Sequence, residues 1–262
     1  MEGCLSGKVC LVAGAGSGIG KEIGLTFAAN GADVVITSIG KKPTDLMRQF
    51  EKMGCKAIYE QADVTDYTQM RAAVEDAIKQ MGKIDVLVAS GGNKSQQHPI
   101  PVSTVDFFRD IDPSLYVDYA QTRWLNRAVC ARAVLDHMIE QGGGNMIFIA
   151  SDAGRVATPS ESMVGSAFAA VIMLAKTLAL EFKRWKIRVN CICPTAVQGT
   201  QAFEMTRSTN AGRKVFAGVE EKMAFGVPDA SDIAEAALFF ASDASRCVTG
   251  QILSVNSGLS FP

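Results

Sequence analysis

The sequence predicts a doubly wound α/β fold, in a single domain that spans residues 1–262. Near-continuous apolar runs of strand length alternate with amphipathic helical stretches along the whole chain. The first apolar run, residues 9–13, ends at a cluster of glycines that opens a helical stretch. No Pro- or Ser-rich linker divides the chain. Strands that are apolar on both faces belong to parallel sheets covered by helices on each side, so the alternation indicates that architecture.

Each element begins and ends where the residue pattern changes. Short apolar runs are interpreted as strands, and longer stretches with apolar residues at helical spacing are interpreted as helices. The expected strands are residues 9–13, 33–37, 56–59, 84–88, 145–150, 187–193 and 252–255. The expected helices are residues 20–29, 44–53, 68–81, 116–141, 163–185 and 231–241.

Residues 196–228 depart from this pattern, because they are irregular, mixed in charge and weakly periodic. Long segments without regular structure are uncommon inside compact domains, and many of them are lids over active sites. We therefore expect a substrate lid at 196–228. A long surface excursion is the alternative.

Composition excludes several classes of function. The chain has 26 basic and 27 acidic residues, and no basic stripe that would suggest nucleic acid or basic amphipathic segment that would suggest a membrane surface. The apolar stretches are interrupted before they reach the length of a membrane span, and residues 1–4 lack a signal-peptide pattern. The seven cysteines form no metal-like cluster. These features predict a cytoplasmic protein without a metal.

The glycine cluster after the first strand carries a binding hypothesis. In Gly14-Ala15-Gly16-Ser17-Gly18-Ile19-Gly20, Gly14 permits a tight turn, Gly18 lets the backbone approach a pyrophosphate, and Gly20 lets the helix pack on the sheet. The helix N-terminus would face the anion. This strand–turn–helix context predicts a Rossmann-type dinucleotide site. Its contacts would come from Gly14, Ser17, Gly18, Ile19 and Gly20. A turn that holds no ligand is the alternative.

The spacing Gly-x-x-x-Gly-x-Gly resembles that of the short-chain dehydrogenase/reductase family, and the resemblance covers nearly the whole chain. Asp63-Val64 resembles the pair that contacts adenine in that family. Residues 85–92 resemble the family's Asp-x-Leu-Val-Asn-Asn-Ala-Gly segment without its two asparagines. Further resemblances lie at residues 149–154, 188–194 and 249–251.

The resemblance leaves the choice between NAD and NADP open. NAD preference usually requires an acidic residue at the end of the second strand, where it binds the ribose hydroxyls. That position is occupied by Ser38. The missing acid permits NADP, and Lys41 or Lys42 could meet a 2′-phosphate. Two solvated loop lysines are an equally good interpretation.

The resemblance implies a catalytic set of Asn, Ser, Tyr and Lys, of which this chain keeps one member. The serine position is Ser151, the tyrosine position thirteen residues later is Val164, and the lysine position four residues further is Phe168. The asparagine position is interpreted as Ser114. Thr195 replaces a glycine where nicotinamide would lie. Neither valine nor phenylalanine can transfer a proton, so both chemistry and cofactor affinity are expected to be weak or lost.

Other ionisable side chains could serve instead, although each has a simpler structural role. The candidates are Tyr116, Tyr119, Asp152, Glu161, Lys94 and His98. The carboxylates could cap helices, the tyrosines could pack in the core, and the other two could be exposed loop residues.

These observations favour a non-catalytic subunit of a hetero-oligomeric dehydrogenase. Relatives in the family assemble as tetramers through two long helices, here 116–141 and 163–185, and through the last strand. Residues 151–155 and Glu161 resemble members that act on alicyclic and aromatic-derived acyl-CoA substrates. The expected partner is a catalytic paralogue, and the substrate a hydroxyacyl-CoA. A lyase or isomerase that reuses the pocket, and a nucleotide-sensing module, are the alternatives.

Overall fold

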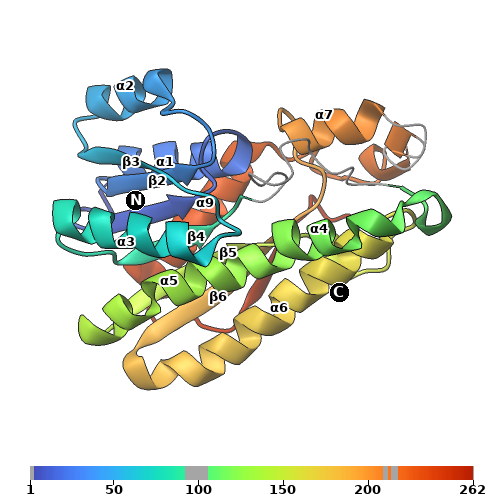
Figure 1. The fold of residues 1–262 in the computed structure, drawn as a ribbon. Helices are drawn as coiled ribbons and strands as arrows, with labels where there is room; N and C mark the ends of the chain where they lie inside the picture. Colours follow the sequence, from blue (N-terminus) through green and yellow to red (C-terminus); the bar gives the residue numbers. More distant parts are fainter. Residues whose placement is uncertain (1–2, 92–105, 209–211, 214–217, 262) are drawn as a thin grey trace.

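The fold is a seven-stranded parallel sheet, seen in a computed structural model that describes residues 3–91, 106–208, 212–213 and 218–261 (Figure 1). The strand order is β3-β2-β1-β4-β5-β6-β7, and every neighbouring pair is parallel. The strands are β1 Val9–Ala13, β2 Asp33–Ser38, β3 Ala57–Gln61, β4 Val86–Ala89, β5 Gly144–Ile149, β6 Ile187–Pro194 and β7 Ile252–Val255. The order reverses direction between β1 and β4, which is where doubly wound folds open a crevice for ligands.

Helices cover both faces of the sheet. The α-helices are α1 Gly18–Ala29, α2 Thr44–Lys52, α3 Tyr67–Met81, α4 Tyr116–Ala120, α5 Asn126–Glu140, α6 Ser162–Phe182, α7 Gln201–Ser208 and α9 Ala230–Ala241. A π-helical turn, η3 Gln121–Leu125, joins α4 to α5. Short 3₁₀ helices are η1 Phe108–Asp110, η2 Pro113–Leu115, η4 Asp152–Gly154, η5 Lys183–Trp185 and η6 Asp243–Ser245.

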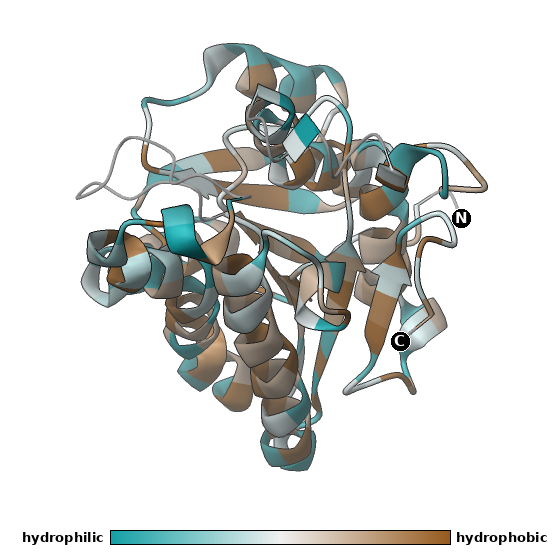
Figure 2. Ribbon diagram, turned by 90° about the vertical axis from the view of Figure 1, so that its right-hand side faces the viewer, coloured by the Kyte–Doolittle hydropathy of each residue, from teal (hydrophilic) through white to brown (hydrophobic). Residues whose placement is uncertain are grey.

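The core consists of two apolar layers, one on each face of the sheet. On one face, α3, α5 and α6 bury Met70, Val134 and Val171 against alternate strand residues. On the other face, α1 and α9 contribute Phe27 and Leu238. Brown strands run through the interior in Figure 2. Because both faces are covered, the strands read as continuous apolar runs in the sequence.

The predicted fold class is confirmed. All seven expected strands exist, and the bounds of the first and last agree with expectation. The expected helix 116–141 is one continuous helical rod made of α4, η3 and α5. Residues 196–228 are less irregular than expected, because they contain α7.

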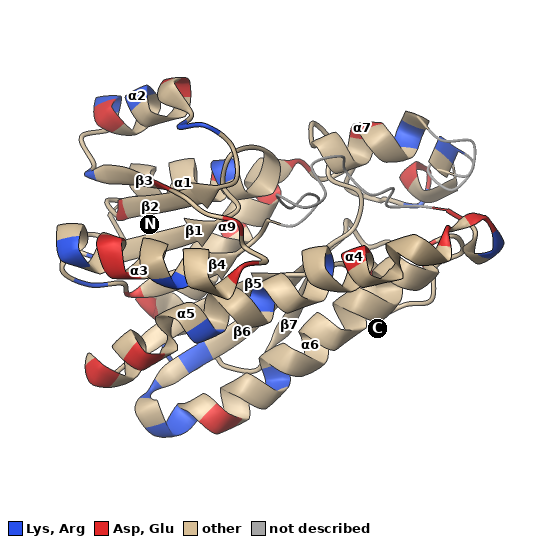
Figure 3. Cartoon of the chain, in the orientation of Figure 1, with Lys and Arg blue, Asp and Glu red and all other residues tan. Residues whose placement is uncertain are grey.

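Helix α6 has an outer face with large exposed apolar side chains. Met173 and Leu180 are 61% and 65% exposed, and Figure 3 shows few charged residues on this helix. Together with η5, it is long and apolar enough to cross a membrane by length and composition, the one such helix in the described part of the chain. This corrects the expectation that no apolar stretch reaches that length. Core helices of globular proteins pass the same test, and α6 packs against β6 and has six buried residues.

Candidate functional site

A cavity of about 770 Å³ opens at the carboxyl edge of the sheet. Its walls include Gly14 after β1, Ser90 after β4, Ala150 after β5 and Thr195 after β6. This is the edge at which open parallel sheets bind ligands. The described residues contain no group of three or more side chains that could hold a metal ion.

The glycine loop forms one end of the cavity. Gly14 has a φ of +79°, and a Cβ atom there would lie 2.1 Å from Cα of Gly91. A Cβ atom at Gly20 would lie 2.6 Å from the carbonyl oxygen of Gly14. Ser17 precedes α1 in an extended conformation, and its side chain caps no backbone N–H. The first N–H groups of α1 therefore keep the anion-binding capacity of a helix N-terminus.

Two of the residues expected to contact adenosine also line the cavity. Ser38 and Val64 line the cavity, and the Ser38 hydroxyl lies 3.2 Å from the Tyr59 hydroxyl. Asp63 is buried instead, and its carboxylate accepts hydrogen bonds from the backbone N–H and hydroxyl of Thr65. Lys41 lies on the cavity wall.

Ser151 stands at the centre of the cavity wall, after β5. Its Oγ accepts a hydrogen bond from the N–H of Ala153 and so caps η4. The loop packs directly on α6, because a Cβ atom at Gly165 would lie 2.7 Å from the carbonyl oxygen of Ala153. A Cβ atom at Gly154 would meet the backbone of Phe168 at 2.6 Å. These two close approaches fix which turn of α6 faces Ser151.

That turn of α6 carries Val164 and Phe168, and both line the cavity. Val164 is 6% exposed and packs in an apolar cluster with Ile111 and Tyr119. Phe168 packs against the same cluster and against the main core. The wall opposite Ser151 is therefore apolar at the two positions expected to carry tyrosine and lysine.

Comparison with known proteins decides the family. The family model described as Enoyl-(Acyl carrier protein) reductase matches residues 14–260. The 3-oxoacyl-[acyl-carrier-protein] reductase FabG of Thermotoga maritima is 32% identical over 97% of this chain and 98% of its own length. The chain belongs to the short-chain dehydrogenase/reductase family.

Other members of this oxidoreductase family are similar over nearly their whole length. The 7alpha-hydroxysteroid dehydrogenase of Escherichia coli (strain K12) is 31% identical over 97% of this chain and 94% of its own. A solved 7 alpha-hydroxysteroid dehydrogenase, complexed with NADH and 7-oxo glycochenodeoxycholic acid, has a TM-score of 0.86 at 29% identity, covering 97% of this chain and 94% of its own. Carveol dehydrogenase from Mycobacterium avium, in complex with NAD, has a TM-score of 0.85 at 28% identity, covering 98% of this chain and 99% of its own.

Two buried arginines on the helical rod line the cavity of this short-chain dehydrogenase/reductase. Arg123, on the π-helical turn, and Arg127, on α5, line the cavity and are 2% and 3% exposed. Burial lowers the pKa of each to about 10, so both remain cationic at neutral pH. π-Helical turns often occur at functional sites. Neither arginine is among the site residues expected from the sequence.

The residue interpreted as the asparagine position lies elsewhere. Ser114 is in η2, is exposed and does not line the cavity. Its backbone N–H donates to the Asp112 carboxylate. The helical rod instead presents Thr122 and Arg123 to the cavity. Ser114 lies away from the cavity because it precedes the rod, whereas Arg123 lies on the face of the rod that points to the cavity.

The alternative ionisable candidates divide into structural and cavity groups. The Asp152 carboxylate is buried and accepts hydrogen bonds from Ser254, Asn256 and Ser260, so it anchors the C-terminal segment. Glu161 lines the cavity, and burial raises its pKa to about 7.

The remaining candidates have other surroundings. Tyr116 stacks on Phe108, and the ring of Tyr119 lies 4.8 Å from Cζ of Arg123. Lys94 and His98 lie outside the described residues. Of the four candidates that the structure describes, Asp152 and Glu161 line the cavity, and the Asp152 carboxylate is engaged by the hydrogen bonds from the C-terminal segment.

The residues present fit a dinucleotide at one end of the cavity better than at the other. The glycine loop and the start of α1 form a tight backbone cradle, which excludes a Cβ at Gly14 and at Gly20, as a pyrophosphate site requires. At the other end, Thr195 and Phe168 occupy wall positions where the resemblance expects glycine and lysine. The described residues of segment 196–228 contribute part of the cavity wall, including Thr200, Phe203 and Lys222.

Proposed function

We propose that this chain is the non-catalytic subunit of a hetero-oligomeric short-chain dehydrogenase acting on a hydroxyacyl-CoA. The observation that carries the proposal is the apolar surface formed by Val164 and Phe168 directly against the Ser151 loop. A hydride transfer to or from a carbonyl needs a group that moves a proton, and neither side chain has one. The catalytic step is assigned to a paralogue that keeps the tyrosine and lysine.

The outer face of α6 supports assembly with that paralogue. Met173 and Leu180 lie two helical turns apart on α6 and are well exposed. Exposed apolar residues on one face of a helix are typical of an interface with another protein. Val117 on α4 is also 63% exposed. The proposed assembly is a heterotetramer in the cytoplasm.

The substrate class rests on resemblance. Residues 151–155 and Glu161 resemble members that act on aromatic-derived acyl-CoA substrates. Curated relatives include, by name, a 3-oxoacyl-[acyl-carrier-protein] reductase and a cis-4-hydroxycyclohexanecarboxylate dehydrogenase. In kind, the proposed subunit is similar to the inactive partner in 2-(hydroxybenzyl)succinyl-CoA dehydrogenase of anaerobic toluene degradation.

Co-expression with a paralogue that has intact tyrosine and lysine tests the proposal. We expect one complex of defined mass that contains both chains and oxidises hydroxyacyl-CoA substrates with NAD or NADP. A homotetramer that excludes the paralogue when both are made together would contradict the proposal.

Two alternatives each have a specific observation in their favour. Glu161, whose pKa is raised to about 7 and which lies on the cavity wall, favours a lyase or isomerase with a carboxylate base. The intact glycine cradle favours a nucleotide-sensing module. Turnover without a nicotinamide cofactor would support the first, and tight dinucleotide binding without turnover the second.

A further inference from the structure

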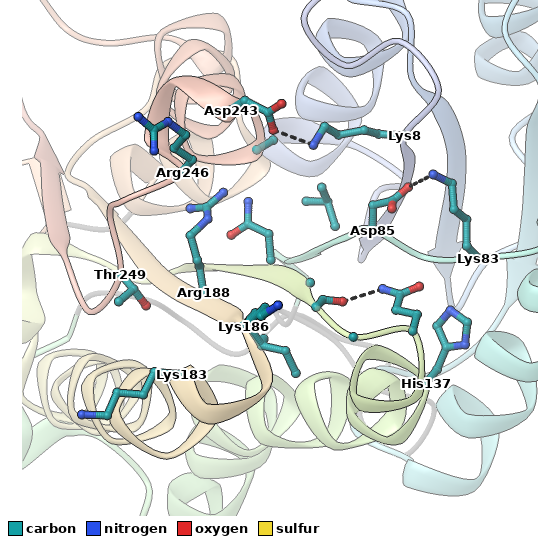
Figure 4. Close-up of a pocket in the computed structure, with 18 of the residues that line it drawn as sticks. Lys8, Lys83, Asp85, His137, Lys183, Lys186, Arg188, Asp243, Arg246 and Thr249 are labelled. Atoms are coloured by element: carbon teal, nitrogen blue, oxygen red, sulfur yellow. Dashed lines mark hydrogen bonds and ion pairs between the residues drawn. The ribbon is translucent and has the colours of Figure 1, made fainter.

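A second cavity, of about 630 Å³, lies at the amino edge of the sheet. Its wall includes Lys8 before β1, Asp85 before β4 and Arg188 in β6 (Figure 4). Asn145 in β5 also lines it. The glycine loop follows β1 at the carboxyl edge, so the sheet separates the two cavities. We call this second cavity the basic bowl. Its residues have no part in the proposed function.

The basic bowl is rich in cations. Six of its lining side chains are Lys or Arg and two are Asp, which gives a formal charge of +4. Two pairs neutralise each other, Lys8 with Asp243 at 2.8 Å and Lys83 with Asp85 at 2.9 Å. The other four basic side chains have no carboxylate within 4.0 Å among the described residues. They are Lys183, Lys186, Arg188 and Arg246.

Helix ends account for part of this positive charge. The C-terminal ends of α3, α5, α6 with η5, and α9 all reach the bowl. Each helix C-terminus carries about half a negative charge and is stabilised by nearby Lys or Arg. Four such ends supply roughly two negative charges, so about two positive charges remain uncompensated.

Asn145 supplies an independent sign of a ligand. The residue is 4% exposed, and its Nδ2 donates to the carbonyl oxygen of Phe240 at 2.5 Å. Its Oδ1 is the one buried side-chain oxygen or nitrogen without a partner in the described part of the chain. An unpaired buried acceptor costs about 1–3 kcal/mol, which a hydroxyl or amino donor would recover.

The shape of the bowl leaves room for such a ligand. Gly82 and Gly142–Gly144 line it without side chains, and a Cβ atom at Gly82 or Gly142 would meet nothing within 4 Å. Arg188 is held in place by hydrogen bonds to the carbonyl oxygens of Val248 and Phe240.

We propose that the basic bowl binds a small organic diphosphate that carries a hydroxyl group, of the class of nucleoside diphosphates. The diphosphate carries enough negative charge at neutral pH to neutralise the roughly two uncompensated positive charges, and the hydroxyl matches the free oxygen of Asn145. Lys186 and Arg246 would contact the phosphates. Arg188, held by its hydrogen bonds to the backbone, would attract the phosphates from a fixed position.

Calorimetric titration of the full-length chain, alone or in its complex, with ADP tests this assignment. We expect saturable binding that weakens at least about tenfold in Lys186→Glu and in Arg246→Glu, because each variant replaces an attractive charge with a repulsive one. The matched control is Lys52→Glu. Lys52 is exposed at the C-terminus of α2 and has no ion pair among the described residues. Lys52→Glu therefore places a negative charge at a helix C-terminus, as the two bowl variants do, but away from the bowl. We expect it to bind ADP like the unmodified chain.

Three results would overturn the proposal. One is the absence of saturable binding up to about 10 mM ADP, a range that corresponds to under 3 kcal/mol of binding free energy. Another is binding that both bowl variants leave unchanged, which would place ADP in the glycine-loop cavity. The third is an equal loss in Lys52→Glu, which would reveal a nonspecific charge effect. If Lys186→Glu fails to fold, Arg246→Glu decides alone.

Discussion

The guanidinium of Arg127 lies over the ring of Phe168, with Cζ 5.6 Å from the ring centroid. It also donates hydrogen bonds to the carbonyl oxygens of Ser90, Gly91 and Ile149, at the carboxyl ends of β4 and β5. Phe168 occupies the position where the resemblance expects a lysine. The chain thus holds a cation near that position, but one that packs against an aromatic ring and is anchored to the backbone.

This contact predicts that restoring the lysine destabilises the protein. Phe168→Lys removes a cation–π contact worth about 0.5–2 kcal/mol and places a second cation near buried Arg127. We expect the free energy of unfolding to fall by about 2 kcal/mol or more, measured by urea denaturation. Phe168→Met keeps an apolar side chain and is the control, with an expected loss of about 1 kcal/mol. Equal stability of both variants would show that Arg127 does not oppose a lysine here.

The isolated chain is expected to show no hydride transfer with NAD(H) or NADP(H). Val164 and Phe168 cannot move a proton, and Ser151 alone can only polarise a carbonyl. Steady-state assays over hydroxyacyl-CoA, alcohol and ketone substrates measure this. Turnover that survives removal of contaminating enzymes, and disappears in Ser151→Ala, would contradict the expectation.

Binding of NAD and NADP to the isolated chain is expected to be weak, with NAD in the millimolar range. The glycine cradle is intact, but Phe168 and Ser38 occupy the positions of the ribose-binding lysine and of the acid after the second strand. Each lost charged contact is worth roughly 1.5–3 kcal/mol, so the two losses weaken a micromolar NAD site to about millimolar, whereas NADP loses the lysine contact alone. Calorimetric titration measures the constant, and a micromolar value would show that the cradle alone holds the cofactor.

The sequence predicts the central strands well because both of their faces are buried, which leaves uninterrupted apolar runs such as Val9–Ala13, whereas the edge strands β3 and β7 are only partly buried. The register of α6 is also predictable, since Gly154 and Gly165 are the small residues that allow the Ser151 loop to reach it. Both features can be recognised in short stretches of sequence, as an apolar run or as a glycine.

The arginines of the helical rod are harder to predict, although a signal exists. Tyr119, Arg123 and Arg127 follow one another at intervals of four residues, on the same inward stripe as Cys130 and Val134. Two arginines on a buried stripe indicate that carbonyl groups or a ligand must meet them. The carbonyl groups that Arg127 contacts lie at the ends of β4 and β5, far away in the sequence. The sequence alone therefore could not identify the partners of the arginines.

Glu161 predicts a dependence of stability on pH. Burial raises its pKa from 4.5 to about 7, although a hydrogen bond with Thr158 partly opposes the shift. Between these values the unfolded chain has lost a proton that the folded chain keeps, so stability falls as pH rises from 4.5 to 7 and then levels off. The upper bound of the loss is about 3 kcal/mol.

Urea denaturation at pH 5 and pH 8 checks this dependence. Glu161→Gln removes the titrating group, so we expect it to lose less stability than the unmodified chain between the two pH values. Glu181→Gln, at an exposed site on the same helix, is the control and should behave like the unmodified chain. If Glu161→Gln and the unmodified chain share one pH profile, Glu161 does not titrate in this range.

The outer face of α6 predicts where the catalytic paralogue binds. Leu180→Glu introduces a charge at a site that is 65% exposed, so folding of the isolated chain should change little, whereas burial of that charge in an apolar interface is costly. We expect loss of the paralogue from the complex in native mass spectrometry, and the same result for Met173→Glu. Met53→Glu, at an exposed apolar site beyond the end of α2, is the matched control and should retain the paralogue. A complex that survives both α6 substitutions would show that this face does not form the interface, and a complex lost equally in Met53→Glu would show that added negative charge alone disrupts assembly.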